Sequence, residues 1–316
     1  MRPPLRLWSP SMNPLSRSRL LRRIALAAAV LIAAGGAQAK TVQFQDLSVE
    51  VVGEGRPVLM IPGLNSAGET WRETCAALQA DRVQCHIVQL PGFAGAPAVK
   101  TDRFADSMRD RLLAYIKDRK LAKPVVMGHS LGGFIALEMA IEQPKAIDRL
   151  VIVDSLAFLG ALQNPAATAE SVKPMAEAMR KRMTEQDADT YRLGVANAVK
   201  GMSLDEKRVA TLVQWGEASD RATTAQAMYE MMVTDLRPQL AKIKAPTLLL
   251  GSWAAYATYG ATKESTTAIF KAQYAGLDGV RIELSQAGYH FLMWDDPKWL
   301  QDQVRGFIDA GAGHGG

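Results

Sequence analysis

Residues 125–134 read VVMGHSLGGF, and this stretch decides how the chain folds. An apolar β-branched run leads into the pattern G-x-S-x-G, and helical apolar spacing follows over 134–141. The order predicts a strand, a sharp turn and a helix, in which Gly128 and Gly132 allow the strand and the helix to approach closely. Ser130 would stand at the helix N-terminus, where free amides favour a developing negative charge. The alternative is a glycine-rich turn with no chemical role.

Strand and helix patterns alternate on both sides of this stretch. Further strands are predicted at residues 41–44, 47–52, 58–61, 83–90, 149–154, 247–250 and 280–284, and helices at 69–79, 104–117, 262–274 and 297–308. The alternation predicts an α/β fold class with a doubly wound, mostly parallel sheet built from residues 40–155 and 241–310. Residues 156–240 carry only helical patterns, which indicates an inserted helical cap over the strand ends. Residues 311–316 read as a disordered tail.

The charge of the chain is uneven. The sequence has 37 Lys and Arg against 32 Asp and Glu, but six of the arginines and no acid lie in residues 1–39. The remainder is nearly neutral, so we expect no nucleic-acid partner.

Residues 1–39 resemble an export signal. A basic stretch at 17–23 precedes an apolar run at 24–34 and the small-x-small sequence Ala-Gln-Ala at 37–39. We therefore expect a signal peptide, a periplasmic or secreted protein, and no stable membrane span after cleavage. An uncleaved anchor is the alternative, and translation could begin at Met12.

Cys75 and Cys85 are the two cysteines of the chain. One lies on a predicted helix and the other at the start of the next strand. An oxidising compartment permits a disulfide between them, and two buried free thiols are the alternative.

Five motifs make the chain resemble the α/β-hydrolase family, with a helical cap after the sixth strand. They are IPGL (61–64), LPGF (90–93), GHSLGG (128–133), APTLLLG (245–251) and GYHF (288–291). The resemblance covers about residues 47–309 and implies an esterase-like or lipase-like serine hydrolase that needs no metal or cofactor.

The resemblance also implies roles for individual residues. Ser130 corresponds to the nucleophile, and His290 corresponds to the base that takes its proton. The backbone amides of Leu131 and Leu64 would form the oxyanion hole. His129 belongs to the turn, and we expect its side chain to point away from the reacting groups.

The acid departs from the common family pattern. Most relatives have an aspartate shortly after the strand that here ends at Gly251, but this chain has no carboxylate between Asp235 and Glu264. Asp154, at the end of the sixth strand, is the candidate that some relatives use instead. A buried carboxylate there needs a partner, which His290 could supply. Glu264, Asp235 or a Ser–His dyad without an acid are the alternatives.

The loop after Gly251 carries three aromatic residues, Trp253, Tyr256 and Tyr259, which we expect to shape a substrate pocket. The cap is rich in methionine, which suits an adaptable apolar wall. The expected activity is hydrolysis of a small-molecule carboxylic ester through an acyl-serine. Amide or lactone hydrolysis, carbon–carbon cleavage and acyl transfer remain open, as does a non-catalytic binding protein of the same fold. The oligomeric state is also open.

Overall fold

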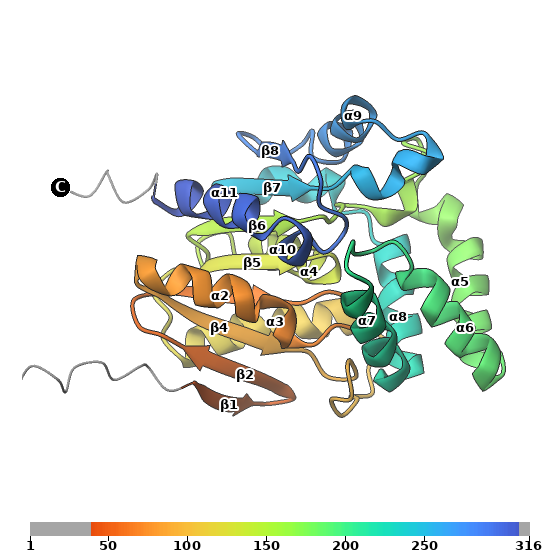
Figure 1. The fold of residues 1–316 in the computed structure, drawn as a ribbon, viewed down its shortest axis with the longest axis horizontal. Coiled ribbons are helices and arrows are strands. Elements are labelled where there is room, and N and C mark those ends of the chain that lie inside the picture. Colours follow the sequence, from red (N-terminus) through yellow and green to blue (C-terminus); the bar gives the residue numbers. More distant parts are fainter. Residues whose placement is uncertain (1–38, 310–316) are drawn as a thin grey trace, which may run out of the picture. The chain divides into compact units, whose positions relative to one another are not determined.

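An eight-stranded sheet forms the centre of residues 39–309, which are the residues that the computed structural model describes (Figure 1). Its order is β1-β2-β4-β3-β5-β6-β7-β8. The strands are β1 (Lys40–Phe44), β2 (Leu47–Val52), β3 (Arg56–Ile61), β4 (Val83–Gln89), β5 (Val125–His129), β6 (Arg149–Val153), β7 (Thr247–Gly251) and β8 (Arg281–Leu284). β2 pairs antiparallel with both β1 and β4, and all neighbouring strands from β4 to β8 are parallel. The predicted α/β fold class is confirmed.

Helices cover both faces of the sheet. The helices outside the predicted cap are α2 (Arg72–Leu78), α3 (Phe104–Asp118), α4 (Leu131–Glu142), α9 (Lys263–Gln273), α10 (Leu292–Asp295) and α11 (Pro297–Asp309). Neighbouring residues of β5 belong to different cores, since Val126 packs with α3, α4 and α9, whereas Val125 and Met127 pack with α2, α10 and α11. Because successive side chains of a strand point to opposite faces, the continuous apolar run of β5 is buried on both sides.

Four helices lie between β6 and β7 in the chain, within the predicted insertion 156–240. They are α5 (Ala169–Glu185), α6 (Ala188–Val199), α7 (Glu206–Ala218) and α8 (Arg221–Val233). Figure 1 shows them beyond the sheet edge toward which β6 and β7 point. We call residues 156–240 the cap. The predicted signal peptide and the predicted tail 311–316 lie outside the described residues, apart from Ala39. Within residues 39–309, no helix has both the length and the apolar character needed to cross a membrane.

Glu230 fastens the cap to the core. Its buried carboxylate, on α8, accepts the backbone N–H of Phe104 and of Ala105, each at 2.6 Å. These two amides open α3 and have no acceptor within that helix, so a cap residue satisfies donors that the helix cannot.

A disulfide joins Cys75 on α2 to Cys85 on β4. The two Cα atoms are 6.1 Å apart, which lies within the normal range for a disulfide. The bond therefore links a covering helix to the sheet beneath it.

Candidate active site

Ser130 lies in the turn between β5 and α4. Its backbone is at φ 52° and ψ −120°, a conformation that costs energy for a residue with a side chain. The Ser130 N–H donates to the Val153 carbonyl at 2.9 Å, which holds the strained turn against β6. A Cβ on Gly128 would collide with the Gly132 backbone, and a Cβ on Gly132 with the Ile61 backbone. Glycine is therefore required on both sides of the serine.

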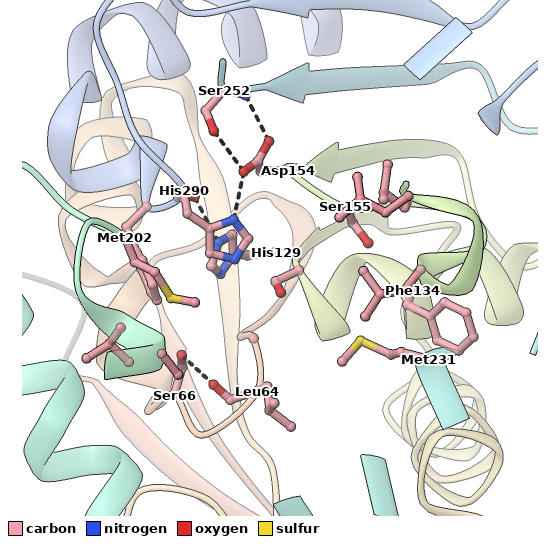
Figure 2. Close-up of a pocket in the computed structure, with 18 of the residues that line it drawn as sticks. Leu64, Ser66, His129, Phe134, Asp154, Ser155, Met202, Met231, Ser252 and His290 are labelled. Carbon is pink, nitrogen blue, oxygen red and sulfur yellow. Dashed lines mark hydrogen bonds and ion pairs between the residues drawn. The ribbon is translucent and has the colours of Figure 1, made fainter. Parts of the chain in front are cut away.

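Asp154 and His290 form a hydrogen-bonded pair beyond the ends of β6 and β8 (Figure 2). His290 Nδ1 is 2.7 Å from Asp154 Oδ2. Ser252 donates its N–H to Asp154 Oδ1 at 2.8 Å and its hydroxyl to Oδ2 at 2.9 Å. The side chain of Asp154 is only 7% exposed, and these three hydrogen bonds compensate for the burial of its charge. Because a carboxylate only accepts, Nδ1 carries the proton and Nε2 is free to accept one.

Ser130 and His290 line the same cavity. Among the described residues, the Ser130 hydroxyl makes no side-chain hydrogen bond, to His290 or to any other group. Contacts of this kind are often long before substrate binds and shorten in the reacting complex.

The other carboxylates considered for the acid are engaged elsewhere. Asp235 accepts from Arg237 Nε at 2.8 Å and from Arg237 Nη2 at 2.7 Å. Glu264 is exposed in the first turn of α9. Neither forms a hydrogen bond with His290, so Asp154 is the carboxylate that the fold brings to the histidine.

The two candidate oxyanion donors are the backbone N–H groups of Leu131 and Leu64. Leu131 is the first residue of α4, so its N–H has no acceptor within the helix. Gly63 lies so close that a Cβ on it would be 3.2 Å from Ser130 Cβ, so the loop that continues into Leu64 passes next to the serine. The next residue, Asn65, accepts from the Thr224 hydroxyl of α8 at 2.6 Å. The cap therefore fixes the loop that carries one of the two amides.

His129 occupies a position that the sequence did not indicate. Its ring is fully buried and lies 4.6 Å, centre to centre, from the ring of His290. His129 Nε2 donates to the His290 carbonyl at 3.0 Å. Burial and the nearby His290 lower the pKa of His129 well below its usual value, which keeps the ring neutral. The expectation that this side chain points away is corrected: it packs directly against the base.

A cavity of about 440 Å³ opens in front of these groups. Its wall is mostly apolar, and the cap contributes Met202, Met228 and Met231. Among residues 39–309, Asp154 is the only carboxylate in the wall, and no lysine or arginine lines it. Within residues 39–309, no group of three or more His, Cys, Asp or Glu side chains could hold a metal ion.

Two aromatic residues of the loop after Gly251, Tyr256 and Trp253, lie in different surroundings. Tyr256, in a short 3-10 helix (Ala254–Tyr259), lines the cavity. Trp253 does not line it, and its side chain packs against the hydrophobic core that α3, α4 and α9 form with the sheet. Its buried Nε1 has no hydrogen-bond partner among the described residues. The prediction for the Tyr259 side chain lies outside the described residues.

Residues 58–303 match the family model described as "Alpha/beta hydrolase family". The chain belongs to the α/β-hydrolase family. One relative of this α/β-hydrolase is the pimeloyl-[acyl-carrier protein] methyl ester esterase of Vibrio atlanticus, 26% identical over 203 residues, or 63% of this chain and 76% of the relative. The enzyme of the same name from Nitrosomonas europaea is 25% identical over 209 residues, or 65% of this chain and 79% of the relative.

Two solved structures share the fold. A hydrolase from Pseudomonas aeruginosa superposes with a TM-score of 0.70 at 17% identity, over 87% of this chain and 99% of that one. An esterase from Exiguobacterium antarcticum gives 0.68 at 18% identity, over 86% and 100%. At these identities the likeness concerns architecture alone, and the activity has to be argued from the site.

Proposed function

We propose that this α/β-hydrolase is a serine hydrolase that cleaves carboxylic esters through an acyl-Ser130 intermediate. One observation carries the proposal: His290, with Nδ1 bound by Asp154 and Nε2 free, shares a cavity with Ser130 in its strained turn. This is the combination of nucleophile, base and orienting acid that acyl transfer requires. The ester-cleaving names of its relatives agree with this chemistry.

The reaction follows from the roles of these groups. His290 Nε2 takes the Ser130 proton as the oxygen attacks the ester carbonyl, and Asp154 stabilises the resulting imidazolium. The amides of Leu64 and Leu131 hold the oxyanion, and each donor of this kind is worth about 3 kcal/mol in the transition state. Collapse of the tetrahedral intermediate breaks the ester bond, and His290 returns the proton to the leaving alcohol. Water, activated by the same histidine, then hydrolyses the acyl-serine and restores the free hydroxyl.

The cavity wall favours an uncharged, apolar acyl group. Its methionine and leucine side chains can make dispersion contacts with an acyl chain, and none of the described residues that line the cavity is a lysine or an arginine. A carboxylate at the far end of the acyl chain would be buried there without a cation, which is costly. The substrate class that fits is therefore a small-molecule ester with a neutral acyl chain.

Two matched esters test the substrate class. Methyl hexanoate and monomethyl adipate have acyl chains of equal length, ending in a methyl group and a carboxylate respectively. We expect kcat/KM, followed in a pH-stat, to favour methyl hexanoate by at least about tenfold, corresponding to ~1.4 kcal/mol of discrimination. Equal rates would contradict the assignment of a neutral acyl group.

Ser130→Ala is the control for the activity itself. It should abolish hydrolysis and also prevent labelling by a fluorophosphonate, which reacts with an activated serine. A wild-type protein that neither hydrolyses esters nor takes the label would favour the alternative of a non-catalytic binding protein.

We also propose that the protein is exported after cleavage of residues 1–39. The basic, apolar and small-x-small segments of that region support this, as does the Cys75–Cys85 disulfide, a bond that persists in oxidising compartments. N-terminal sequencing of the protein from a bacterial periplasmic fraction should begin at Lys40. A cytoplasmic protein that retains Met1 or Met12 would refute export.

A further inference from the structure

The loop that carries His290 is anchored to the core on one side. The Ser285 hydroxyl accepts the N–H of Gly288 at 2.8 Å and donates to Asp296 at 2.6 Å. Ser285 directly follows β8, and Asp296 directly follows α10. This anchor fixes the start of the loop to the sheet, but it does not touch the residues next to His290.

The residue after His290 is anchored to the cap instead. The Phe291 N–H donates to the Met202 carbonyl at 3.1 Å. Met202 belongs to the turn between α6 and α7, residues 200–205, which we call the cap turn. The Met202 side chain lines the cavity, so a bound acyl group would touch the same turn.

The residue before His290 is anchored to the cap turn through Asp295. The Asp295 carboxylate accepts the Tyr289 N–H at 3.1 Å. It also accepts the Ser203 hydroxyl at 2.6 Å and the Leu204 N–H at 3.1 Å. Ser203 is only 5% exposed, so its bond to the carboxylate is shielded from water and correspondingly strong.

Both neighbours of His290 are thus bonded, directly or through one carboxylate, to a single turn of the cap. His129 holds the carbonyl of His290 itself. Once these three contacts fix the backbone, the ring can meet Asp154 at 2.7 Å with Nδ1 protonated and Nε2 facing the cavity.

We propose that the cap turn, through Ser203 and Asp295, is the device that positions His290, so that the base is aligned only while the cap is seated. This inference rests on the proposed function, because it concerns the base of that reaction. Ser203 and Asp295 are positioning residues, since they act on the substrate only through His290. Occupation of the cavity against Met202 would favour the same seated arrangement.

Ser203→Ala is the test, and Ser219→Ala is its matched control. Ser219 is also a buried cap serine, 7% exposed, and it also ties the cap to the core, since its hydroxyl accepts the Ala94 N–H at 2.9 Å. The hydrogen bonds of its hydroxyl among the described residues go to Ala94 and Trp215, and none reaches the His290 loop. We expect Ser203→Ala to lower kcat about tenfold with KM changed less than about twofold, as for loss of one hydrogen bond to a charged group. Ser219→Ala should leave both constants unchanged.

A readout independent of turnover is the proton on the His290 ring. With 15N-labelled histidine, the sequence offers only four imidazoles, at His86, His129, His290 and His314, so His290 can be assigned from His290→Ala. We expect the wild type and Ser219→Ala to hold the Nδ1–H form, and Ser203→Ala to show exchange between the two tautomers.

The outcomes separate the two proposals. Should the wild type cleave no ester while the tautomer changes only in Ser203→Ala, the proposed function fails and the positioning role stands. Should the wild type cleave esters while Ser203→Ala and Ser219→Ala match it in kcat and tautomer, the positioning role is overturned. Asp295→Asn, which keeps the side-chain size but loses one oxygen acceptor, replaces Ser203→Ala if that variant does not fold.

Discussion

Replacement of Asp154 by asparagine should nearly abolish activity while preserving the fold. The amide has the same shape, but only one of its two ends can accept a hydrogen bond. Asp154 Oδ1 accepts the Ser252 N–H at 2.8 Å, and a backbone N–H cannot reverse its direction. The amide oxygen must therefore face that N–H, which turns the NH₂ group toward His290 Nδ1 and the Ser252 hydroxyl.

The magnitude follows from this forced orientation. An NH₂ group at the position of Oδ2 stabilises His290 only when Nδ1 is unprotonated, so Nε2 carries the proton and cannot accept one from Ser130. The ring is then held in the wrong tautomer and is not merely loosened. Loss of the acid in a triad of this kind lowers kcat by about 10⁴, which corresponds to roughly 5 kcal/mol of transition-state stabilisation.

The assay is p-nitrophenyl butyrate hydrolysis, with Ser130→Ala defining the background and the thermal midpoint reporting the fold. We expect KM to change little, because the Asp154 carboxylate is engaged by His290 and Ser252, and the asparagine keeps its shape in the cavity wall. A fall of less than tenfold in a variant that melts like the wild type would refute the assignment. The acid would then have to be sought at Asp235 or Glu264, although neither forms a hydrogen bond with His290 in this structure.

Three further predictions concern stability and alignment. Burial raises the pKa of the Glu138 carboxyl from 4.5 to about 8 in the folded protein. Because the unfolded chain ionises this group at lower pH, the group lowers the stability of the fold progressively from about pH 4.5 to 8. Glu138→Gln should therefore melt at a higher Tm than the wild type at about pH 8.5, with a gain that shrinks toward about pH 4, whereas parallel curves of Tm against pH would contradict this. Cys75→Ser with Cys85→Ser opens a loop of 10 residues and should cost roughly 2.7 kcal/mol, or about 5 °C in Tm by calorimetry; an unchanged Tm would mean that the bond does not stabilise. Ser252→Ala removes one of three hydrogen bonds to Asp154 and should lower kcat about tenfold in the same esterase assay, with a wild-type kcat as the contrary result.

The sequence was sufficient to predict the sheet and the turn at Ser130. A tight turn between a buried strand and a helix leaves no room for a Cβ at Gly128 or Gly132, so its geometry depends on a few residues that are close in the sequence. The strands are equally local, since β5 and β7 are short, largely apolar runs that each begin after a proline. These features depend on neighbouring residues and on burial, and the spacing of apolar residues and glycines in the sequence indicates both.

Contacts between side chains that are far apart in the sequence could not be predicted from sequence patterns. The contact of His129 with His290 joins residues 161 apart, and nothing near His129 indicates which way its ring turns. Trp253 was predicted to face the pocket from its place in a loop at the sheet edge, but the large apolar indole is stabilised more by packing against the core. The bond between Ser203 and Asp295 likewise joins a cap turn to a helix 92 residues later, and neither segment carries a motif.

The arrangement of the strands offers a replacement for the carboxylate that is missing after β7. β6 and β7 are parallel neighbours, and their pairing brings the residues that follow Val153 and Gly251 side by side at one sheet edge. The segment after β7 lacks the carboxylate of the common family pattern, and Asp154 at the adjacent strand end is the acid that we propose instead. Ser252, the first residue of that segment, then contributes an N–H and a hydroxyl that bind the carboxylate. The proposed acid therefore stands one strand, about 5 Å, from the position of the common family pattern, and the segment at that position supplies donors that bind it. For this reason the effects of the two substitutions on kcat should not add. Ser252→Ala should lower kcat in the wild-type background, but it should cause little further loss in a protein that already carries Asp154→Asn.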